Sequence, residues 1–137
     1  MSSEVQAFAS GFPITLLHAG ITFALLVAGC ALYLTLSRFK EISRISEGNS
    51  ASAVSFGGVI LGLAIPLSMS LNASTSLIEI GVWGAATIAV QLLAFWLIDR
   101  LLSGLPQRIA DGEVAAAVLL VAAKLSVAII LAAAVAG

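Results

Sequence analysis

The sequence predicts an all-α membrane protein with four transmembrane helices, built from two parallel two-helix repeats in one integral membrane domain, residues 1–137. Three observations support this fold class. Of the 137 residues, 61% are apolar and only 9% are charged, which is too few charges for the surface of a soluble domain. The apolar residues form four runs, each long enough to cross a bilayer as a helix. The segments that join these runs in pairs carry the same short motif.

The four apolar runs mark the predicted helices. Each run is far longer than a buried strand, and none shows the alternation expected of a barrel strand, so helices are predicted. The first is also too long for a signal-peptide core, and residues 1–10 contain no basic side chain, so we expect no cleavage there. The runs cover residues 12–37, 51–71, 77–98 and 114–136.

The basic side chains predict the orientation of the chain. Lys and Arg are retained on the cytoplasmic side during insertion, whereas acidic residues have little influence. The five basic residues outside the helices all fall between the first and second runs or between the third and fourth. Both termini are therefore predicted to lie on the periplasmic side. The five residues are Arg38, Lys40, Arg44, Arg100 and Arg108.

The two predicted cytoplasmic loops resemble each other at a fixed offset. Residues 44–54 align with residues 108–118 at an offset of 108 − 44 = 64, with six of the eleven positions identical. We interpret this as a duplicated hairpin, with repeat 1 at 12–71 and repeat 2 at 77–136. Each unit crosses the membrane twice, so the copies run in the same direction about an axis along the membrane normal. A compact four-helix bundle is the expected product.

The shared motif, R-I-x-(E/D)-G, has two interpretations. In the structural one, the arginine pairs with the acid three residues later, and the glycine ends the turn. In the functional one, the two loops form a docking surface for a cytoplasmic protein. Both remain open at the level of sequence. The motif residues are Arg44, Glu47, Gly48, Arg108, Asp111 and Gly112.

Small residues spaced by four predict where helices touch, because helices in lipid associate through close packing. Such stripes can serve contacts within one chain or between chains of a homo-oligomer. They comprise Gly20, Ala24 and Ala28 in the first helix, Ala53 with Gly57 and Gly58 with Gly62 in the second, and Gly81, Ala85 and Ala89 in the third.

Pro66 predicts a bend near the outer end of the second helix. Proline removes one backbone donor and crowds the carbonyl of Gly62, four residues earlier. A tolerated kink and a hinge are both compatible with this position.

Lys124 is the only charged residue deep in a predicted span, where a charge costs about 2.5 to 3.5 kcal/mol on insertion scales. It lies about 15 Å from the start of its helix, and Gln91 lies about 10 Å from the end of the third, so a hydrogen bond between them is expected. Gln91 shares a face with Thr87 and Gly84. The strip could line a solute or ion path, hold a proton acceptor, or merely satisfy the lysine.

His18 and Glu79 both lie near the predicted outer membrane face, on the first and third helices. They could pair or titrate together, although a single histidine at an interface is more often structural.

Several classes of function are not supported by the sequence. A net charge of −1 gives no electrostatic basis for binding nucleic acid. One cysteine and one histidine provide no metal cluster, and no phosphate loop or catalytic triad is present, so we expect no cofactor, no metal and no enzymatic activity.

An ordered set of segments resembles the YjfL-like bacterial inner-membrane family, known as domain of unknown function 350. The resemblance covers about residues 12–135 and implies a four-span inner-membrane protein without an assigned activity. Relatives are often encoded near phage-shock-type envelope-stress proteins and glutathionylspermidine-synthase-like enzymes, which implies envelope maintenance. In the family the place of Lys124 is usually small or uncharged, and Asn is common near Leu131, so this chain departs there. The segments are 58–68, 74–79, Trp83-Gly84, Gln91-Leu92, Phe95 and 108–112.

Two hypotheses for function follow. The first is a non-enzymatic, oligomeric membrane subunit that contacts the lipid bilayer and recruits a cytoplasmic partner through the duplicated loops. The second is a small channel or transporter with a polar path near Gln91 and Lys124.

Overall fold

The computed structural model describes residues 2–137, and within that range the chain is all-helical. Four helices are long and apolar enough to cross a membrane, which confirms the predicted all-α class. The short helices α2, Glu41–Ser46, and α5, Leu105–Ala110, lie in the predicted loops. The long helices are α1, Ser3–Leu36; α3, Ser50–Ala73; α4, Leu77–Leu101; and α6, Val114–Ala136.

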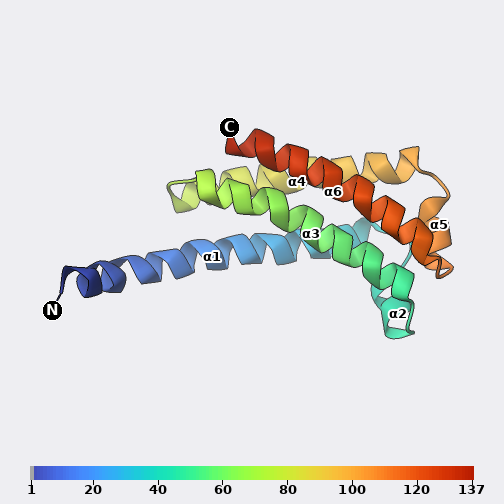
Figure 1. Ribbon diagram of the computed structural model, residues 1–137, viewed down its shortest axis with the longest axis horizontal. Helices are drawn as coiled ribbons and strands as arrows, with labels where there is room; N and C mark the ends of the chain where they lie inside the picture. Colours follow the sequence, from blue (N-terminus) through green and yellow to red (C-terminus); the bar gives the residue numbers. More distant parts are fainter. Residues whose placement is uncertain (1) are drawn as a thin grey trace.

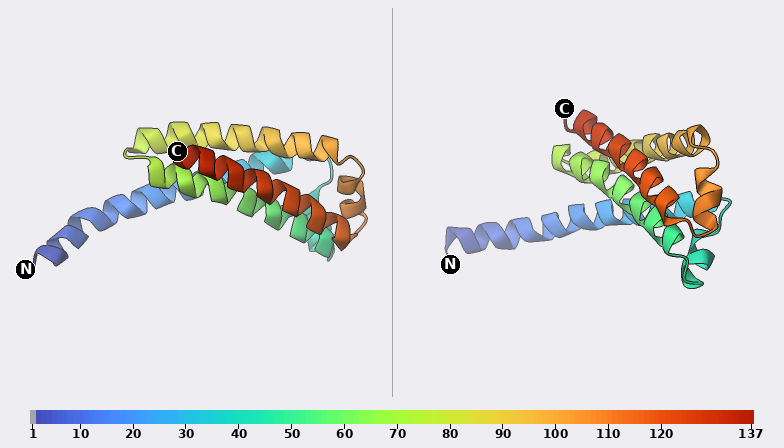
Figure 2. Two further views of the ribbon diagram at one scale, coloured as in Figure 1. Left: turned by 45° about the horizontal axis from the view of Figure 1, so that its top comes forward. Right: turned by 45° about the vertical axis from the view of Figure 1, so that its right-hand side comes forward.

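Three of the long helices lie side by side along most of their length. Figure 1 shows α3, α4 and α6 as one bundle, with α2 and α5 together at one end, here called the α2/α5 end. The turn between α3 and α4 and the C-terminus lie at the opposite end, as the further views in Figure 2 also show. The chain therefore runs back and forth in the manner expected of four spans.

The first half of α1 leaves the bundle. Figure 1 shows its N-terminal part diverging from α3 and α4. Only 6% of its most apolar stretch is buried, against 44% for α3. The expectation of a compact bundle is wrong for this segment. Lipid solvates apolar side chains such as Phe8, Phe12 and Leu16 as well as protein does, so no hydrophobic force draws them inward.

Glycines allow the closest helix contacts. A Cβ added at Gly58 of α3 would lie 2.5 Å from a methyl carbon of Val121 in α6, and one at Gly62 would lie 2.6 Å from the Phe95 ring in α4. A Cβ at Gly84 of α4 would lie 2.5 Å from Leu25 in α1. These three glycines therefore serve contacts within the chain.

Other predicted small-residue stripes face outward. A Cβ added at Gly20, Gly57 or Gly81 would meet nothing within 4 Å. Ala24 and Ala28 on α1 are exposed, as are Ala85 and Ala89 on α4. These stripes make no close helix contact in the described chain.

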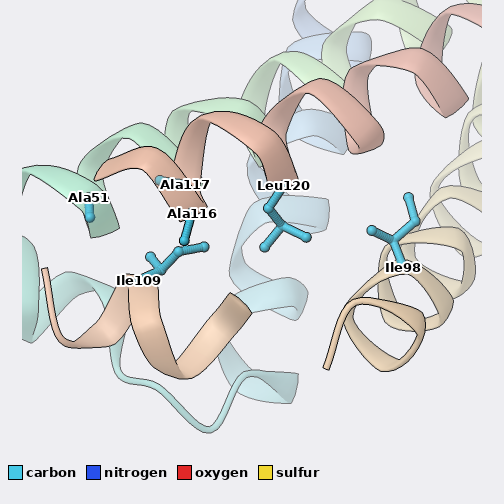
Figure 3. Close-up of a cluster of buried hydrophobic side chains, with 6 residues drawn as sticks. All are labelled: Ala51, Ile98, Ile109, Ala116, Ala117 and Leu120. Carbon is cyan, nitrogen blue, oxygen red and sulfur yellow. The ribbon is translucent and has the colours of Figure 1, made fainter. Parts of the chain in front are cut away.

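A buried apolar cluster fixes the α2/α5 end of the bundle. Figure 3 shows Ile109 of α5 and Ile98 of α4 packed toward the start of α6. A second cluster, from α1, α3 and α4, occupies the middle of the bundle and includes Leu63 and Phe95. Pro66 is buried within a helix that continues to Ala73. The full first cluster is Ala51, Ile98, Ile109, Ala116, Ala117 and Leu120.

The two motif loops have matching backbones. Gly48 and Gly112 adopt φ of +90° and +95°, the left-handed region that glycine favours. Asn49 N–H donates to the carbonyl of Arg44, and Glu113 N–H donates to that of Arg108, both at 2.9 Å. The hairpin duplication itself stays a prediction.

The predicted arginine–acid pairs within each motif are wrong. Arg44 donates instead to backbone carbonyls, from Nε to Phe39 at 2.8 Å and from a terminal nitrogen to Ala110 at 3.0 Å. Arg108 pairs with Glu113 rather than Asp111. The chain reverses at each glycine, so the acid at the end of the short helix is not the group nearest the guanidinium. Asp111 instead accepts a hydrogen bond from Gln107.

The first motif also clamps the second. Asn49 Nδ2 donates to the Ala110 carbonyl at 2.9 Å, beside the bond from Arg44. The Asn49 Oδ1 accepts from Ser52 N–H at 3.0 Å and so caps α3. One asparagine thus starts a spanning helix and ties the two loops together.

We predict that Asn49→Ala lowers the free energy of unfolding by about 1 to 2 kcal/mol. The change removes a helix cap and one of the two hydrogen bonds that the Ala110 carbonyl accepts. Thermal unfolding in detergent micelles measures the change. Ser46→Ala is the matched control, since the Ser46 hydroxyl bonds only within its own turn. Equal stability of the two variants would contradict the clamp.

In the second motif, Glu113 occupies the place of Asn49 and accepts from Arg108 Nε at 2.7 Å. That hydrogen bond lowers the pKa of Glu113 below its ordinary value of 4.5 and raises the pKa of Arg108. A carboxyl with a depressed pKa stabilises the fold above its ordinary pKa, and the stabilisation is lost as pH falls through the folded pKa.

We therefore predict that acidification from about pH 5 to pH 3 narrows the stability difference between the wild type and Glu113→Gln. Both side chains are exposed to solvent, so the effect is small. Melting temperatures across this pH range test it. If the difference in melting temperature between wild type and Glu113→Gln stays constant across this pH range, the hydrogen bond from Arg108 does not lower the pKa of Glu113.

Candidate functional site at the α2/α5 end

Lys124 is buried, with 1% of its side chain exposed, and its charge is balanced inside the protein. Its Nζ lies 3.0 Å from Oδ1 of Asp99 on α4. It also lies 5.3 Å from the ring centroids of Tyr33 on α1 and Phe95 on α4. A carboxylate and two aromatic faces can hold an ammonium group away from water. Three helices thus meet at this lysine.

Helical spacing explains how these side chains meet. The buried residues of α6 include Leu120, Lys124 and Ala128, which recur every four residues on one face. On α4, Phe95 and Asp99 are likewise four residues apart. Side chains lean toward the N-terminus of their helix, and α6 begins at the α2/α5 end. The lysine stem therefore reaches toward Asp99, near the last turn of α4.

The expected hydrogen bond between Gln91 and Lys124 is wrong. Gln91 is completely buried, and neither its amide oxygen nor its nitrogen has a hydrogen-bond partner in residues 2–137. The antiparallel helix directions account for this, because Gln91 on α4 leans toward the opposite end while Lys124 leans toward Asp99. Gly84, Thr87 and Gln91 are all buried on α4, in agreement with the face that their spacing predicts.

A half-open cleft of about 1070 Å³ lies beside the ion pair at the α2/α5 end. Its walls come from the last turns of α1, the start of α2 and α3, the second half of α4, and α5. The polar lining includes Tyr33, Glu41 and Asp99 from three different elements. The apolar lining includes Leu32, Leu36, Ala89 and Leu93, all exposed on the outside of α1 and α4.

Glu41 is the most unusual group in the cleft. It begins α2 after Lys40, which turns the chain with φ of +50°, and only 6% of the residue is exposed. Its Oε1 accepts from the Ser37 hydroxyl at 2.7 Å. Its Oε2 is buried and has no hydrogen-bond partner among the described residues. Asp99 pairs with Lys124, whereas Glu41 forms no ion pair among the described residues.

The family assignment follows from comparison with known proteins. The model of the family Domain of Unknown Function (DUF350) matches residues 7–135. The chain belongs to the DUF350 family. It is similar to the UPF0719 inner membrane protein YjfL of Escherichia coli strain K12, with 27% identity over 106 residues, which are 77% of this chain and 80% of that protein. The protein of the same description from Escherichia coli O157:H7 matches equally well.

No solved structure matches the chain. The family, the relatives and the four apolar helices make this DUF350 chain a small multi-pass protein of the inner membrane. The predicted family is thereby confirmed, and its description assigns no activity.

Two arginines of the DUF350 chain stand at the rim of the cleft. The Arg100 guanidinium lies 4.9 Å from the Trp96 ring centroid, and that of Arg38 lies 6.0 Å from the Phe39 ring. Both arginines are exposed and line the cleft. The cleft therefore combines the acids Glu41 and Asp99 with an outer pair of cations.

The expected pairing of His18 with Glu79 is wrong. Glu79 Oε2 accepts from the backbone N–H of Thr75 at 2.7 Å and from its hydroxyl at 3.0 Å. Among residues 2–137 the ion pairs are Lys124–Asp99 and Arg108–Glu113. His18, on α1, belongs to neither pair. No cluster of three His, Cys, Asp or Glu side chains forms in the same part of the chain.

Sequence reasoning missed Asp99, Glu41 and Tyr33 as members of one site of this DUF350 chain. A signal was present at the offset of the predicted repeat. At the offset of 64, Glu41 aligns with Leu105, Asp99 with Thr35 and Lys124 with Ile60. Each of these three charged residues thus aligns with an uncharged one. Positions where the two aligned segments differ in charge could have indicated the site.

Proposed function

We propose that the protein is a non-enzymatic, oligomeric inner-membrane subunit that recruits a cytoplasmic protein through its α2/α5 end. A role in envelope maintenance is what the family resemblance implies. The observation that carries the proposal is the pair of small-residue stripes on α1 and α4 that face outward. The ion pair at Lys124 supports a structural role for that residue rather than a catalytic one.

The orientation in this proposal has both termini in the periplasm. Its support is the gathering of Arg38, Arg44 and Arg108, with two further basic residues, at the α2/α5 end. In a Cys30→Ala background, Ser46→Cys should react with a membrane-impermeant thiol reagent only from the cytoplasmic side, and Ser74→Cys only from the periplasmic side. The reverse labelling pattern would overturn the orientation.

Assembly is supported by the unused stripe on α1. Gly20, Ala24 and Ala28 are exposed, and small residues at this spacing let a second helix approach closely in lipid. Leu25 and Gly29 on the same stretch of α1 pack against α4 and α3, and the stripe lies on the exposed side of the helix. A second copy of the chain is the occupant we propose for it.

Introducing bulk on this face tests assembly. Ala24→Leu should shift the protein from oligomer to monomer in native mass spectrometry from membrane-mimetic detergent. Val27→Leu is the matched control, because Val27 is also exposed on α1 but lies off its small-residue stripe. An unchanged oligomer in Ala24→Leu, or a monomeric wild type, would overturn the proposal.

Partner recruitment is supported by the hydrogen bonds between the two loops and by the exposed side chains at the α2/α5 end. Arg44 and Asn49 fix the two loops to each other, while Ile42, Glu47 and Asp111 remain exposed. Affinity capture with the wild type and with Glu47→Lys/Asp111→Lys should recover a cytoplasmic protein in the first case alone. Identical captured proteins would count against docking by these charges.

The alternative is a small channel or transporter with a polar path near Gln91 and Lys124. The observation in its favour is the buried, unpartnered amide of Gln91. Flux of ions, protons or small amines through vesicles that contain the protein, abolished in Gln91→Leu, would favour transport. The subunit proposal predicts no flux in either protein.

A further inference from the structure

We propose that the cleft at the α2/α5 end binds a phospholipid whose headgroup carries a primary ammonium and a phosphate, as in an aminophospholipid. This inference is independent of assembly and of a protein partner. It needs only that the protein lies in a bilayer. The acids of the cleft would hold the ammonium, the rim arginines the phosphate, and the apolar wall an acyl chain.

The acid groups create the need for a cation. Only 6% of Glu41 is exposed, and its Oε2 has no hydrogen-bond partner in residues 2–137. Lys124 pairs with Asp99, and Glu41 has no ion-pair partner in the same residues. Burying an unpaired carboxylate is costly, and a bound ammonium supplies both charge and hydrogen bonds. A primary ammonium has three N–H donors, whereas a quaternary one has none.

The rim and the outer wall of the cleft suit a phospholipid better than a simple amine. Arg38 and Arg100 are exposed at the mouth of the cleft, and guanidinium groups bind phosphate oxygens in pairs. Leu32, Leu36 and Leu93 line the same cleft and face outward from α1 and α4, where acyl chains are available. A soluble amine would leave both features unused.

Tryptophan fluorescence gives a direct test in vesicles. The chain has two tryptophans, so Trp83→Phe leaves Trp96, which lines the cleft, as the only reporter. Lipids with brominated acyl chains quench a tryptophan that they contact. We expect brominated phosphatidylethanolamine to bind near Trp96 about tenfold more tightly than brominated phosphatidylcholine, the difference that one charge-assisted hydrogen-bonded contact supplies.

Substitutions in the cleft test which side chains bind the ammonium and the phosphate of the headgroup. Glu41→Gln in the same background should reduce the preference for the primary ammonium to less than about twofold. Glu47→Gln, an exposed acid in the same segment, should retain the full preference. Arg38→Gln should weaken both lipids equally, because both carry the phosphate. An unchanged preference in Glu41→Gln would overturn the assignment.

The lipid series keeps the test decisive if Glu41→Gln fails to fold. With the Trp83→Phe reporter that keeps Glu41, each added N-methyl group on the lipid headgroup should weaken binding of the lipid. Equal quenching by all members would overturn the proposal. Water-soluble glycerophosphoethanolamine should fail to displace the lipid at equal concentration. If it displaces the lipid, the site takes a free headgroup compound and the lipid assignment is wrong.

Discussion

Asp99→Ala is expected to lower the free energy of unfolding by about 3 to 5 kcal/mol, the cost of leaving one member of a buried ion pair without its partner. The Lys124 ammonium would then face only the Tyr33 and Phe95 rings, because it is almost fully buried. Reversible unfolding in mixed micelles measures the change.

A double-mutant cycle separates the pair from general damage to the helix. Lys124→Met should cost less than Asp99→Ala, because methionine keeps the apolar stem and Asp99, 30% exposed, can still reach water in the cleft. Adding Lys124→Met to Asp99→Ala should restore much of the lost stability, since no unpaired charge remains. Strict additivity of the two single changes would contradict a coupled pair.

Gly58→Ala is expected to destabilise the bundle by about 1 to 3 kcal/mol, through overpacking of the α3–α6 contact. The added Cβ would lie 2.5 and 2.9 Å from the two methyl carbons of Val121 and 3.1 Å from its Cβ. The whole β-branched side chain stands in the way, so one rotamer change does not relieve the clash. The free energy of unfolding is again the measurement.

The neighbouring glycine is the control for Gly58. A Cβ at Gly57 meets nothing within 4 Å, so Gly57→Ala should be neutral or stabilise the helix by up to about 1 kcal/mol. Val121→Ala added to Gly58→Ala should recover stability by making room at the contact. Equal behaviour of the two glycine variants would mean that α3 does not meet α6 at Gly58.

The sequence was sufficient for the number and order of the spans. The fourth was placed at 114–136, which are the bounds of α6. Its limits are marked by a polar loop before it, and lipid-length apolar runs leave little choice of structure. The start of α1 at Ser3 was missed, because a polar first turn capped by Ser2 extends the helix beyond its apolar run.

The site was harder to predict because its two acids, Glu41 and Asp99, fell in the predicted loops. Ending the third helix at residue 98 placed Asp99 outside the membrane, and Lys124 then had no acid to meet. In the structure α4 continues to Leu101, so Asp99 stays on the buried face. The depth of the Lys124 backbone along α6 does not give the position of its ammonium group. The side chain points toward the N-terminus of α6, at the α2/α5 end, and therefore reaches Asp99.

The divergence of α1 and the clamp between loops were beyond reach from sequence. Apolar side chains lie on all sides of α1, so no periodicity distinguishes a face turned to protein from one turned to lipid. The bonds from Arg44 and Asn49 end on the backbone carbonyl of Ala110, and every residue offers such an acceptor.

The ion pair between Lys124 and Asp99 is the central claim, and dipolar-coupling solid-state NMR in bilayers tests it most directly. The chain has two lysines and two aspartates, so Lys40→Arg/Asp111→Asn leaves Lys124 and Asp99 as the only labelled pair. With ¹⁵N on the lysine Nζ and ¹³C on the aspartate carboxyl, a strong coupling is predicted for atoms in direct contact, since Nζ and Oδ1 are 3.0 Å apart. Absence of a coupling would contradict the account.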